Sequence, residues 1–342
     1  MINTIPSVPD SKFLNYCLTV GLCVMEGRGF YYPVDTDMGL DGRLYTVSRS
    51  IEDDNRGIRV TMFNLDSEYF GTFGYYGEED GHLISPTGIA VDSKNRIYVS
   101  DEYLQRITVF DSDGRFIKKW GDVGSDPGKL NGPAALTFDV DDNLYVSDHH
   151  NNRIQKFTKD GAYLSHFGCY GSLEGQLDLP WGLSIGPDGD IYVADWGNDR
   201  IQRFSPEGTL QNVYGGPGGG NGEFRKPASV AVDESGYMYI ADWGNQRLQV
   251  LDPEGRFVVK LRGQATNSKW AEEYLTANGE EAEAREDSDL EPDLEFFVDD
   301  PHEESSHIEK FFWAPASVKL DSAGRVYVTE SNRHRVQIYQ RI

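Results

Sequence analysis

The chain has 342 residues, a formal net charge of −24 and 38% hydrophobic residues. The acidic excess argues against nucleic acid as the main partner, because a phosphate-binding surface requires clustered lysine and arginine. No run of apolar residues approaches the ~18–20 that cross a membrane, and residues 1–12 lack the basic and apolar regions of a secretion signal. Since Cys17, Cys23 and Cys169 cannot all pair, we expect reduced thiols and a cytoplasmic location.

From residue 33 onward the sequence repeats itself, mostly at intervals of 47 residues. Each copy begins at a proline and has a tyrosine twelve residues later: Pro33/Tyr45, Pro86/Tyr98, Pro133/Tyr145, Pro180/Tyr192, Pro227/Tyr239 and Pro315/Tyr327. An acidic residue and an arginine recur five residues apart, as Asp101/Arg106, Asp148/Arg153, Asp195/Arg200, Asp242/Arg247 and Glu330/Arg335. We expect these pairs to be structural, because they bracket the same loop in most copies. Six copies of one unit are predicted.

Each copy has the pattern of four short strands. In the copy that starts at Pro180, alternating residues at 191–194 and 201–204 are separated and followed by turns that contain Asp, Gly or Asn, and a fourth strand is expected to end near Tyr214. Alternation with a period of two between such turns is typical of antiparallel hairpins. Six such units predict an all-β, six-bladed β-propeller with four antiparallel strands in each blade.

The repeated segments also resemble a known family. The segments YVADWGNDRIQRF (192–204) and YIADWGNQRLQVL (239–251) are similar to NHL repeats. The resemblance covers nearly the whole chain and implies one NHL propeller over residues 1–342. It also implies a binding role, because NHL domains are often binding modules.

An acidic insertion at residues 266–310 interrupts the repeat before its last copy. It carries sixteen Asp and Glu residues against three Lys and Arg residues. We expect a short helix at 270–278, a solvated or disordered stretch at 279–295, and apolar segments at 296–298 and 311–313 that fold back on the body. By its position, the insertion is expected to overhang the face that carries the connections between blades, as a lid or a partner-binding arm. The alternative is a passive loop.

The last copy, residues 311–342, ends directly after its third strand. In the other copies the fourth strand ends at a glycine twelve residues before the next proline, and Gly21 stands twelve residues before Pro33. Residues 13–21 are therefore predicted to form the outer strand of blade six and to close the ring. Without that strand, the ring would expose unpaired strand edges.

Strand directions place the loops between second and third strands on the same face as the connections between blades, and we call this the top face. Its candidate ligand-binding residues are Tyr103, His149, His150, Trp181, Trp196, Trp243 and His334. The aromatic side chains offer flat apolar contact area to a ligand, although packing over neighbouring blades would also explain the tryptophans. His82, His149, His150 and His334 are weak candidates for a divalent metal, which needs three or four ligands at about 2.0–2.3 Å. No other cofactor is predicted.

Three charged residues break the pattern of small residues near the axis. Two and four residues after the proline, most inner strands carry Gly, Ala, Ser or Thr. Blade one instead has Asp35 and Asp37 at these two positions, and blade six has Lys319 at the second of them. We predict that Asp37 and Lys319 pair near the axis, because isolated charges there would be costly to desolvate. The three residues form either a structural contact or an axial polar site.

The predicted function is a module that binds a protein or a small molecule through its top face. The alternative is a top-face enzyme, a lyase or hydrolase with or without a metal. The resemblance to the amidating-lyase propellers implies zinc histidines directly after the prolines, but those positions hold Val34, Thr87, Ala134, Trp181, Ala228 and Ala316. The gluconolactonase-like propellers imply more axial acidic and Asn ligands than Asp35 and Asp37 supply. RNA binding, known for some animal NHL domains, implies a basic top surface, which an acidic chain does not favour.

Overall fold

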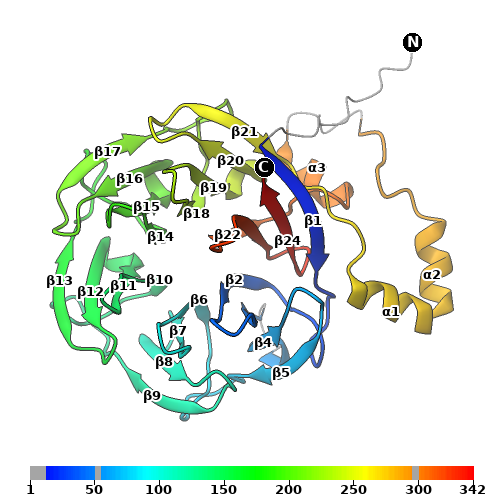
Figure 1. The fold of residues 1–342 in the computed structure, drawn as a ribbon, viewed down its shortest axis with the longest axis horizontal. Helices are drawn as coiled ribbons and strands as arrows, with labels where there is room; N and C mark the ends of the chain where they lie inside the picture. Colours follow the sequence, from blue (N-terminus) through cyan, green and yellow to red (C-terminus); the bar gives the residue numbers. More distant parts are fainter. Residues whose placement is uncertain (1–12, 51–54, 295–299) are drawn as a thin grey trace.

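The computed structural model describes residues 13–50, 55–294 and 300–342. Its strands form six four-stranded antiparallel sheets, which stand as blades around a common axis (Figure 1). The prediction of a six-bladed propeller is therefore confirmed.

Blades 1 to 3 follow the chain from the inner strand to the outer strand. Blade 1 contains β2 (Pro33–Met38), β3 (Leu44–Ser48), β4 (Arg59–Phe63) and β5 (Tyr69–Phe73). Blade 2 contains β6 (Pro86–Val91), β7 (Ile97–Asp101), β8 (Arg106–Phe110) and β9 (Phe116–Trp120). Blade 3 contains β10 (Pro133–Phe138), β11 (Asn143–Asp148), β12 (Arg153–Thr158) and β13 (Tyr163–Phe167).

Blades 4 and 5 have the same order, and blade 6 takes its outer strand from the N-terminal region. Blade 4 contains β14 (Pro180–Ile185), β15 (Ile191–Asp195), β16 (Arg200–Phe204) and β17 (Leu210–Tyr214). Blade 5 contains β18 (Pro227–Val232), β19 (Met238–Asp242), β20 (Arg247–Leu251) and β21 (Phe257–Leu261). Blade 6 contains β22 (Pro315–Leu320), β23 (Arg325–Glu330), β24 (Arg335–Arg341) and β1 (Leu14–Val20). Four loops between second and third strands hold single 3₁₀ turns: η1 (Asn55–Gly57), η2 (His149–Asn151), η3 (Trp196–Asn198) and η4 (Trp243–Asn245).

The closing strand pairs as the repeat spacing predicts. β1 runs antiparallel to β24, from the pair Leu14 and Arg341 to the pair Val20 and Val336. This pairing covers an edge of β24 that would otherwise be exposed, and it joins two segments from opposite ends of the chain.

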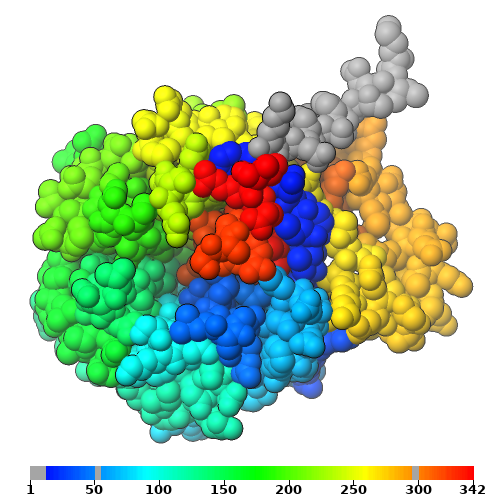
Figure 2. All heavy atoms as spheres, in the orientation of Figure 1, coloured from blue at the N-terminus to red at the C-terminus, as the bar shows by residue number. Residues whose placement is uncertain are grey.

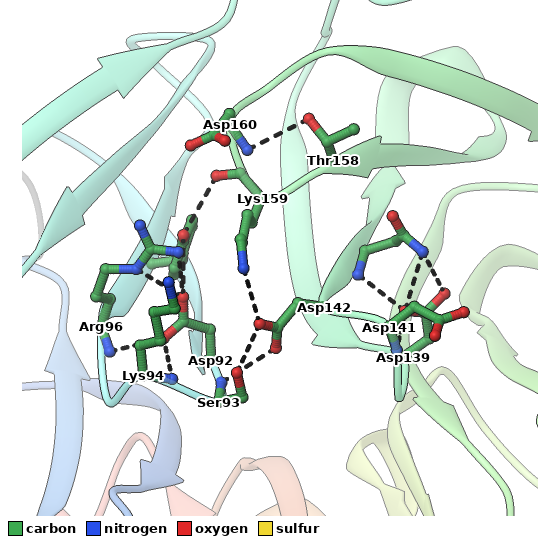
Figure 3. Close-up of polar contacts among 12 residues, drawn as sticks. Asp92, Ser93, Lys94, Arg96, Asp139, Asp141, Asp142, Thr158, Lys159 and Asp160 are labelled. Carbon is green, nitrogen blue, oxygen red and sulfur yellow. Dashed lines mark hydrogen bonds and ion pairs between the residues drawn. The ribbon is translucent and has the colours of Figure 1, made fainter.

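On the face opposite the top face, which we call the bottom face, turns connect neighbouring blades through polar contacts (Figure 3). Between blades 2 and 3, Asp142 accepts hydrogen bonds from the Ser93 backbone N–H and from Lys159 Nζ, both at 3.1 Å. The Tyr98 hydroxyl donates to the Lys159 carbonyl at 3.2 Å. The repeated tyrosine therefore spans from the buried face of its own blade to a turn of the next blade.

The repeated acidic–arginine pairs hold the connections between blades. Arg153 Nε lies 2.7 Å from Asp148 Oδ2. Its terminal nitrogens donate to three carbonyls of the connection that precedes blade 3, at Ser125, Asp126 and Lys129. Arg200 and Arg247 make equivalent contacts. These contacts give the pairs the structural role that their spacing indicates.

The insertion forms helices, and the first two of them lie beside the ring (Figure 1), which differs from the expected solvated stretch and the expected overhang. It contains α1 (Lys269–Ala277), α2 (Gly279–Glu286) and α3 (Pro301–His307). Residues 279–286 are thus helical, and none of them is buried. Figures 1 and 2 show α1 and α2 outside the circle of blades, next to β1, and not over the end of the axis. α3 instead contacts the top-face turn η4, and Arg333 of another top-face loop donates to the Ser305 and Ser306 carbonyls.

A buried tryptophan explains where the insertion lies. Trp270 of α1 is fully buried in a cluster with Phe30 of the connection before blade 1 and Phe63 of β4. Its indole Nε1 donates to the Ser67 carbonyl at 2.7 Å. Of the apolar segments expected to fold back, Phe312 is fully buried, whereas residues 296–298 lie outside the described residues.

Cys17, Cys23 and Cys169 are all free and exposed. Within the described ranges, no helix has the length and apolar character needed to cross a membrane.

Candidate functional site

An apolar cavity of about 310 Å³ lies at the top end of the propeller axis. Its lining comes from the first residues of inner strands and from the loops between second and third strands. We call it the top-face cavity, and its lining residues are Val34, His149, Leu179, Trp181, Trp196, Ala228, Trp243, Ala316 and Ser331. Four predicted ligand-binding residues are thus brought together: His149, Trp181, Trp196 and Trp243.

Tight turns hold three of these aromatic side chains in place. His149, Trp196 and Trp243 each begin a 3₁₀ turn directly after a second strand. In η3, the Asn198 side chain donates to Asp195 and to the Gly171 carbonyl, both at 2.9 Å. The next residue, Asp199, has a φ of 55°, in the left-handed region. Because these contacts fix the backbone of the turn, Trp196 projects from a rigid base.

His149 occupies one wall of the cavity as a neutral ring. Its side chain packs edge-on against Trp181, with ring centroids 4.7 Å apart and an interplanar angle of 85°. Its Nδ1 lies 3.2 Å from the Pro180 carbonyl. Since a carbonyl can only accept, Nδ1 must carry the proton. Burial lowers the pKa of His149, which disfavours its charged form.

The tryptophans leave space between one another. No ring of Trp181, Trp196 or Trp243 packs against another of the three among the described aromatic contacts. Lys226 Nζ lies 4.3 Å from the ring centroid of Trp196, so one cation already uses that indole. Trp243 is 36% exposed, so its ring is available to a ligand.

Below the cavity, the axis narrows to a hollow of about 10 Å³, roughly enough for one water molecule. The ion pair here is not the predicted one. Lys319 Nζ lies 3.7 Å from Asp35 Oδ2, and the described part of the chain shows no such ion pair between Lys319 and Asp37. Asp35 and Asp37 instead accept backbone N–H groups of β6, from Ile89 at 3.1 Å and Val91 at 2.8 Å. The prediction overlooked that an inner strand has free N–H groups on its axial edge, which attract carboxylates.

The three axial residues remain electrostatically coupled. Burial raises the pKa of Asp37, against the attraction of Lys319, which lowers it. Burial would lower the pKa of Lys319, but the Asp35 and Asp37 carboxylates outweigh it and raise that pKa. Lys319 therefore stays charged beneath the top-face cavity.

Three predicted ligand-binding residues do not line the cavity. Tyr103 is 65% exposed in its loop on blade 2, and His150 is exposed beside His149, with ring centroids 4.8 Å apart. His334 packs between blades, where its Nδ1 accepts the Tyr32 N–H at 2.9 Å. Burial lowers the pKa of His334 to about 4. Loop position alone did not separate these roles, because all three positions lie in top-face loops.

The histidines proposed as metal ligands do not converge. Among the described residues, no group of three or more His, Cys, Asp or Glu side chains is placed to hold a metal ion. His82 lies 3.9 Å from Glu79, and His334 is engaged by Tyr32. Only His149 and His150 are neighbours in this set.

Five lining residues were not predicted as ligand-binding: Val34, Leu179, Ala228, Ala316 and Ser331. Leu179 directly precedes Pro180, and Ser331 follows Glu330 of the last acidic–arginine pair. Repeat position could have identified both residues. Ser331 is equivalent in the repeat to His149 and Trp196, and Leu179 lies close to the position that Trp181 occupies.

Comparison with known proteins supports the repeat assignment. The family model of the NHL repeat matches residues 83–110, 130–157, 177–204 and 312–339. The comparison with curated proteins found no match.

Several solved structures share the fold. A streptogramin B lyase is 12% identical, covers 96% of this chain and 98% of its own, and has a TM-score of 0.57. A virginiamycin B lyase from Staphylococcus aureus, in a catalytically inactive form with quinupristin, is 13% identical, with coverages of 93% and 82% and a TM-score of 0.55. A gluconolactonase from Xanthomonas campestris is 16% identical, with coverages of 97% and 89% and a TM-score of 0.55. At these identities, the likeness is one of fold.

Proposed function

Since the chain is an NHL-repeat six-bladed β-propeller, we propose that it is a binding module whose top-face cavity receives an apolar group of a small molecule or a protein. The observation that carries this proposal is the convergence of Trp181, Trp196 and Trp243 on one cavity of about 310 Å³. That volume lies at the lower end of the range for small-molecule sites. The cavity therefore suits one or two rings better than an extended ligand.

The lining supports an uncharged ligand group. Of its nine residues, none is Asp, Glu, Lys or Arg. Apolar contact area and aromatic faces therefore supply the binding energy. A charged group would lose its hydration without gaining a partner of opposite charge.

The proposal can be tested with uncharged one-ring and two-ring aromatic fragments, indole included, by ligand-observed NMR and calorimetry. A double variant, Trp196→Ala with Trp243→Ala, should weaken binding at least roughly tenfold, because each removed indole contributes on the order of 1 kcal/mol or more. Tyr170→Ala provides the control, since Tyr170 is 72% exposed and lies outside the cavity lining. Binding that survives the double variant, or no fragment binding by the wild type, would contradict the proposal.

The enzyme alternative rests on a different observation. The named structural relatives include a lyase and a gluconolactonase, and charged axial residues lie beneath the cavity floor. Metal analysis of the purified protein separates the two proposals. Stoichiometric zinc, copper, iron or calcium would favour the enzyme.

A further inference from the structure

The top-face cavity contains one histidine ring, the one lining ring that can accept a hydrogen bond, and that ring has a defined tautomer. His149 is 7% exposed and lines the cavity. Its Nδ1–H is committed to the Pro180 carbonyl. In the neutral ring, Nε2 is therefore an acceptor without a proton.

Among the described residues, the hydrogen bond of the His149 ring is made by Nδ1 to Pro180, and the Leu179 backbone also raises the pKa of the ring. No hydrogen bond to His149 Nε2 is present in the described residues, and Nε2 is not among their fully buried polar atoms that lack a partner. The nitrogen therefore keeps access to solvent on a side chain that borders the cavity. A ligand that displaces water from Nε2 without replacing its hydrogen bond would lose binding energy.

We propose that the top-face cavity selects an uncharged aromatic ring that carries an N–H or O–H donor, which binds His149 Nε2 while the ring contacts Trp181, Trp196 and Trp243. This inference rests on the proposed function. The indoles provide the flat contact area, and His149 fixes the position of the donor edge. Indoles and phenols are the simplest members of this chemical class.

The surroundings disfavour a cationic ligand. Lys226 Nζ already lies over Trp196 at 4.3 Å, and Lys319 stands below the narrow floor. Asp35 and Asp37 offset the charge of Lys319, but the cavity lining contains no carboxylate to offset that of Lys226. A cation over the indoles would therefore face repulsion, so we infer a neutral ring in spite of the acidic composition of the chain.

Calorimetry with indole and 1-benzothiophene tests the inference, because the two rings have similar shapes and only indole has a donor. The wild type should bind indole roughly three- to tenfold more tightly, the range expected for one hydrogen bond. The variant His149→Phe should bind the two rings with about equal affinity. The control His166→Phe changes an exposed histidine on β13 and should keep the preference for indole. Should His149→Phe fail to fold by its thermal melt, His149→Leu replaces it.

The outcomes separate this inference from the proposed function. Equal affinity of the two rings for the wild type would overturn the role of His149 and leave the cavity as an apolar site. A preference that persists in His149→Phe would also overturn that role. Absence of binding by either ring would overturn both proposals.

A second pair of probes identifies the source of the ring. 3-Methylindole represents a free small molecule, and the blocked peptide acetyl-Gly-Trp-Gly-amide presents the same indole on a protein backbone. Both retain the donor and should depend on His149. Tighter binding of the peptide would assign the site to a protein partner, and tighter binding of 3-methylindole would assign it to a small molecule.

Discussion

The interface that closes the ring, between blades 6 and 1, uses different residues from the repeated interfaces between blades 1 to 5. In the repeated interfaces, an aromatic residue at the end of an outer strand packs on the next blade. The ring pairs Phe73–Phe110, Trp120–Phe157 and Phe167–Phe204 have centroids 4.7 to 4.9 Å apart. At the closing interface, β1 ends in Val20 at the same repeat position, and Trp270 of the insertion packs on Phe63, with centroids 5.7 Å apart.

A second repeated contact also changes at the closing interface. At the four interfaces between blades 2 and 6, an amide or carboxylate side chain accepts a backbone N–H from the residue before the next proline. These contacts join Gln105 to Gly132, Asn152 to Leu179, Asp199 to Lys226 and Gln246 to Ala314, at 2.6 to 2.8 Å. At the closing interface the acceptor is His334, and the donor is the Tyr32 N–H.

The comparison shows that one packing geometry can be satisfied by residues from different places in the chain. The repeated interfaces use neighbours in sequence, because consecutive blades are consecutive in the chain. The closing interface joins distant segments, and the insertion supplies the missing ring. The insertion is thus a structural part of the propeller in addition to any contact with a partner.

Removal of the closing strand should have the largest effect. Deletion of residues 1–22 removes β1 and exposes the edge of β24, so we expect aggregation or an open ring that fails to melt cooperatively. Size-exclusion chromatography and thermal unfolding measure this. Deletion of residues 1–12 leaves all of β1 and should behave like the full chain. A 1–22 deletion that melts like the full chain would refute the role of β1.

Replacement of the inserted ring should have the next largest effect. Trp270→Ala is expected to lower the free energy of unfolding by about 3 to 5 kcal/mol, because a fully buried indole leaves a cavity. Denaturant unfolding provides the measurement. In the matched control Arg28→Ala, loss of the exposed ion pair with Glu273 should cost less than about 1 kcal/mol. Equal effects from the two variants would mean that the insertion adds little to the closing interface.

The closing interface should also respond to acid more than the others do. The pKa of His334 is about 4 in the folded chain and about 6.5 when unfolded, so the unfolded chain binds more protons between these values. The stabilising contact is complete above pH 6.5 and is lost as the pH falls toward 4, by on the order of 2 to 3 kcal/mol.

The variant His334→Asn isolates this contribution. Asparagine keeps an acceptor and tolerates the φ of 53° at this position, as Asn152 does in its own loop. Unfolding followed from pH 7 to pH 4 should show a shallower loss of stability in His334→Asn than in the wild type. His166→Asn should leave the slope unchanged, and an unchanged slope in His334→Asn would contradict the assignment.

The repeat allowed most of the fold to be predicted, because spacing alone identifies strands, blades and the closing strand. The prolines and tyrosines lie where the spacing places them, and Tyr45, Tyr98 and Tyr239 are fully buried. The insertion could not be placed, since nothing in the sequence indicates that Trp270 compensates for a small residue at Val20. The repeat model contains no equivalent of this long-range contact.

The candidate site was predicted less completely for a related reason. Loop position correctly grouped His149 with the tryptophans of the cavity, but it also grouped His334, which repeat spacing aligns with the acceptors Gln105 and Asn152. Comparison of equivalent positions would have assigned His334 to the interface. The direct partner of Lys319 was predicted as Asp37 and is Asp35, because side-chain charges were considered without the backbone N–H groups of β6.

The pairing of β1 with β24 also constrains the order of events during synthesis. Five blades can complete their hairpins as the chain leaves the ribosome, since each uses consecutive segments. β1 has to wait for its partner until almost every other residue has been made. Such a remote contact is slow to form. The apolar residues of β1 therefore stay without their final neighbour throughout translation. Chaperone binding to this nascent end would protect the chain from aggregation.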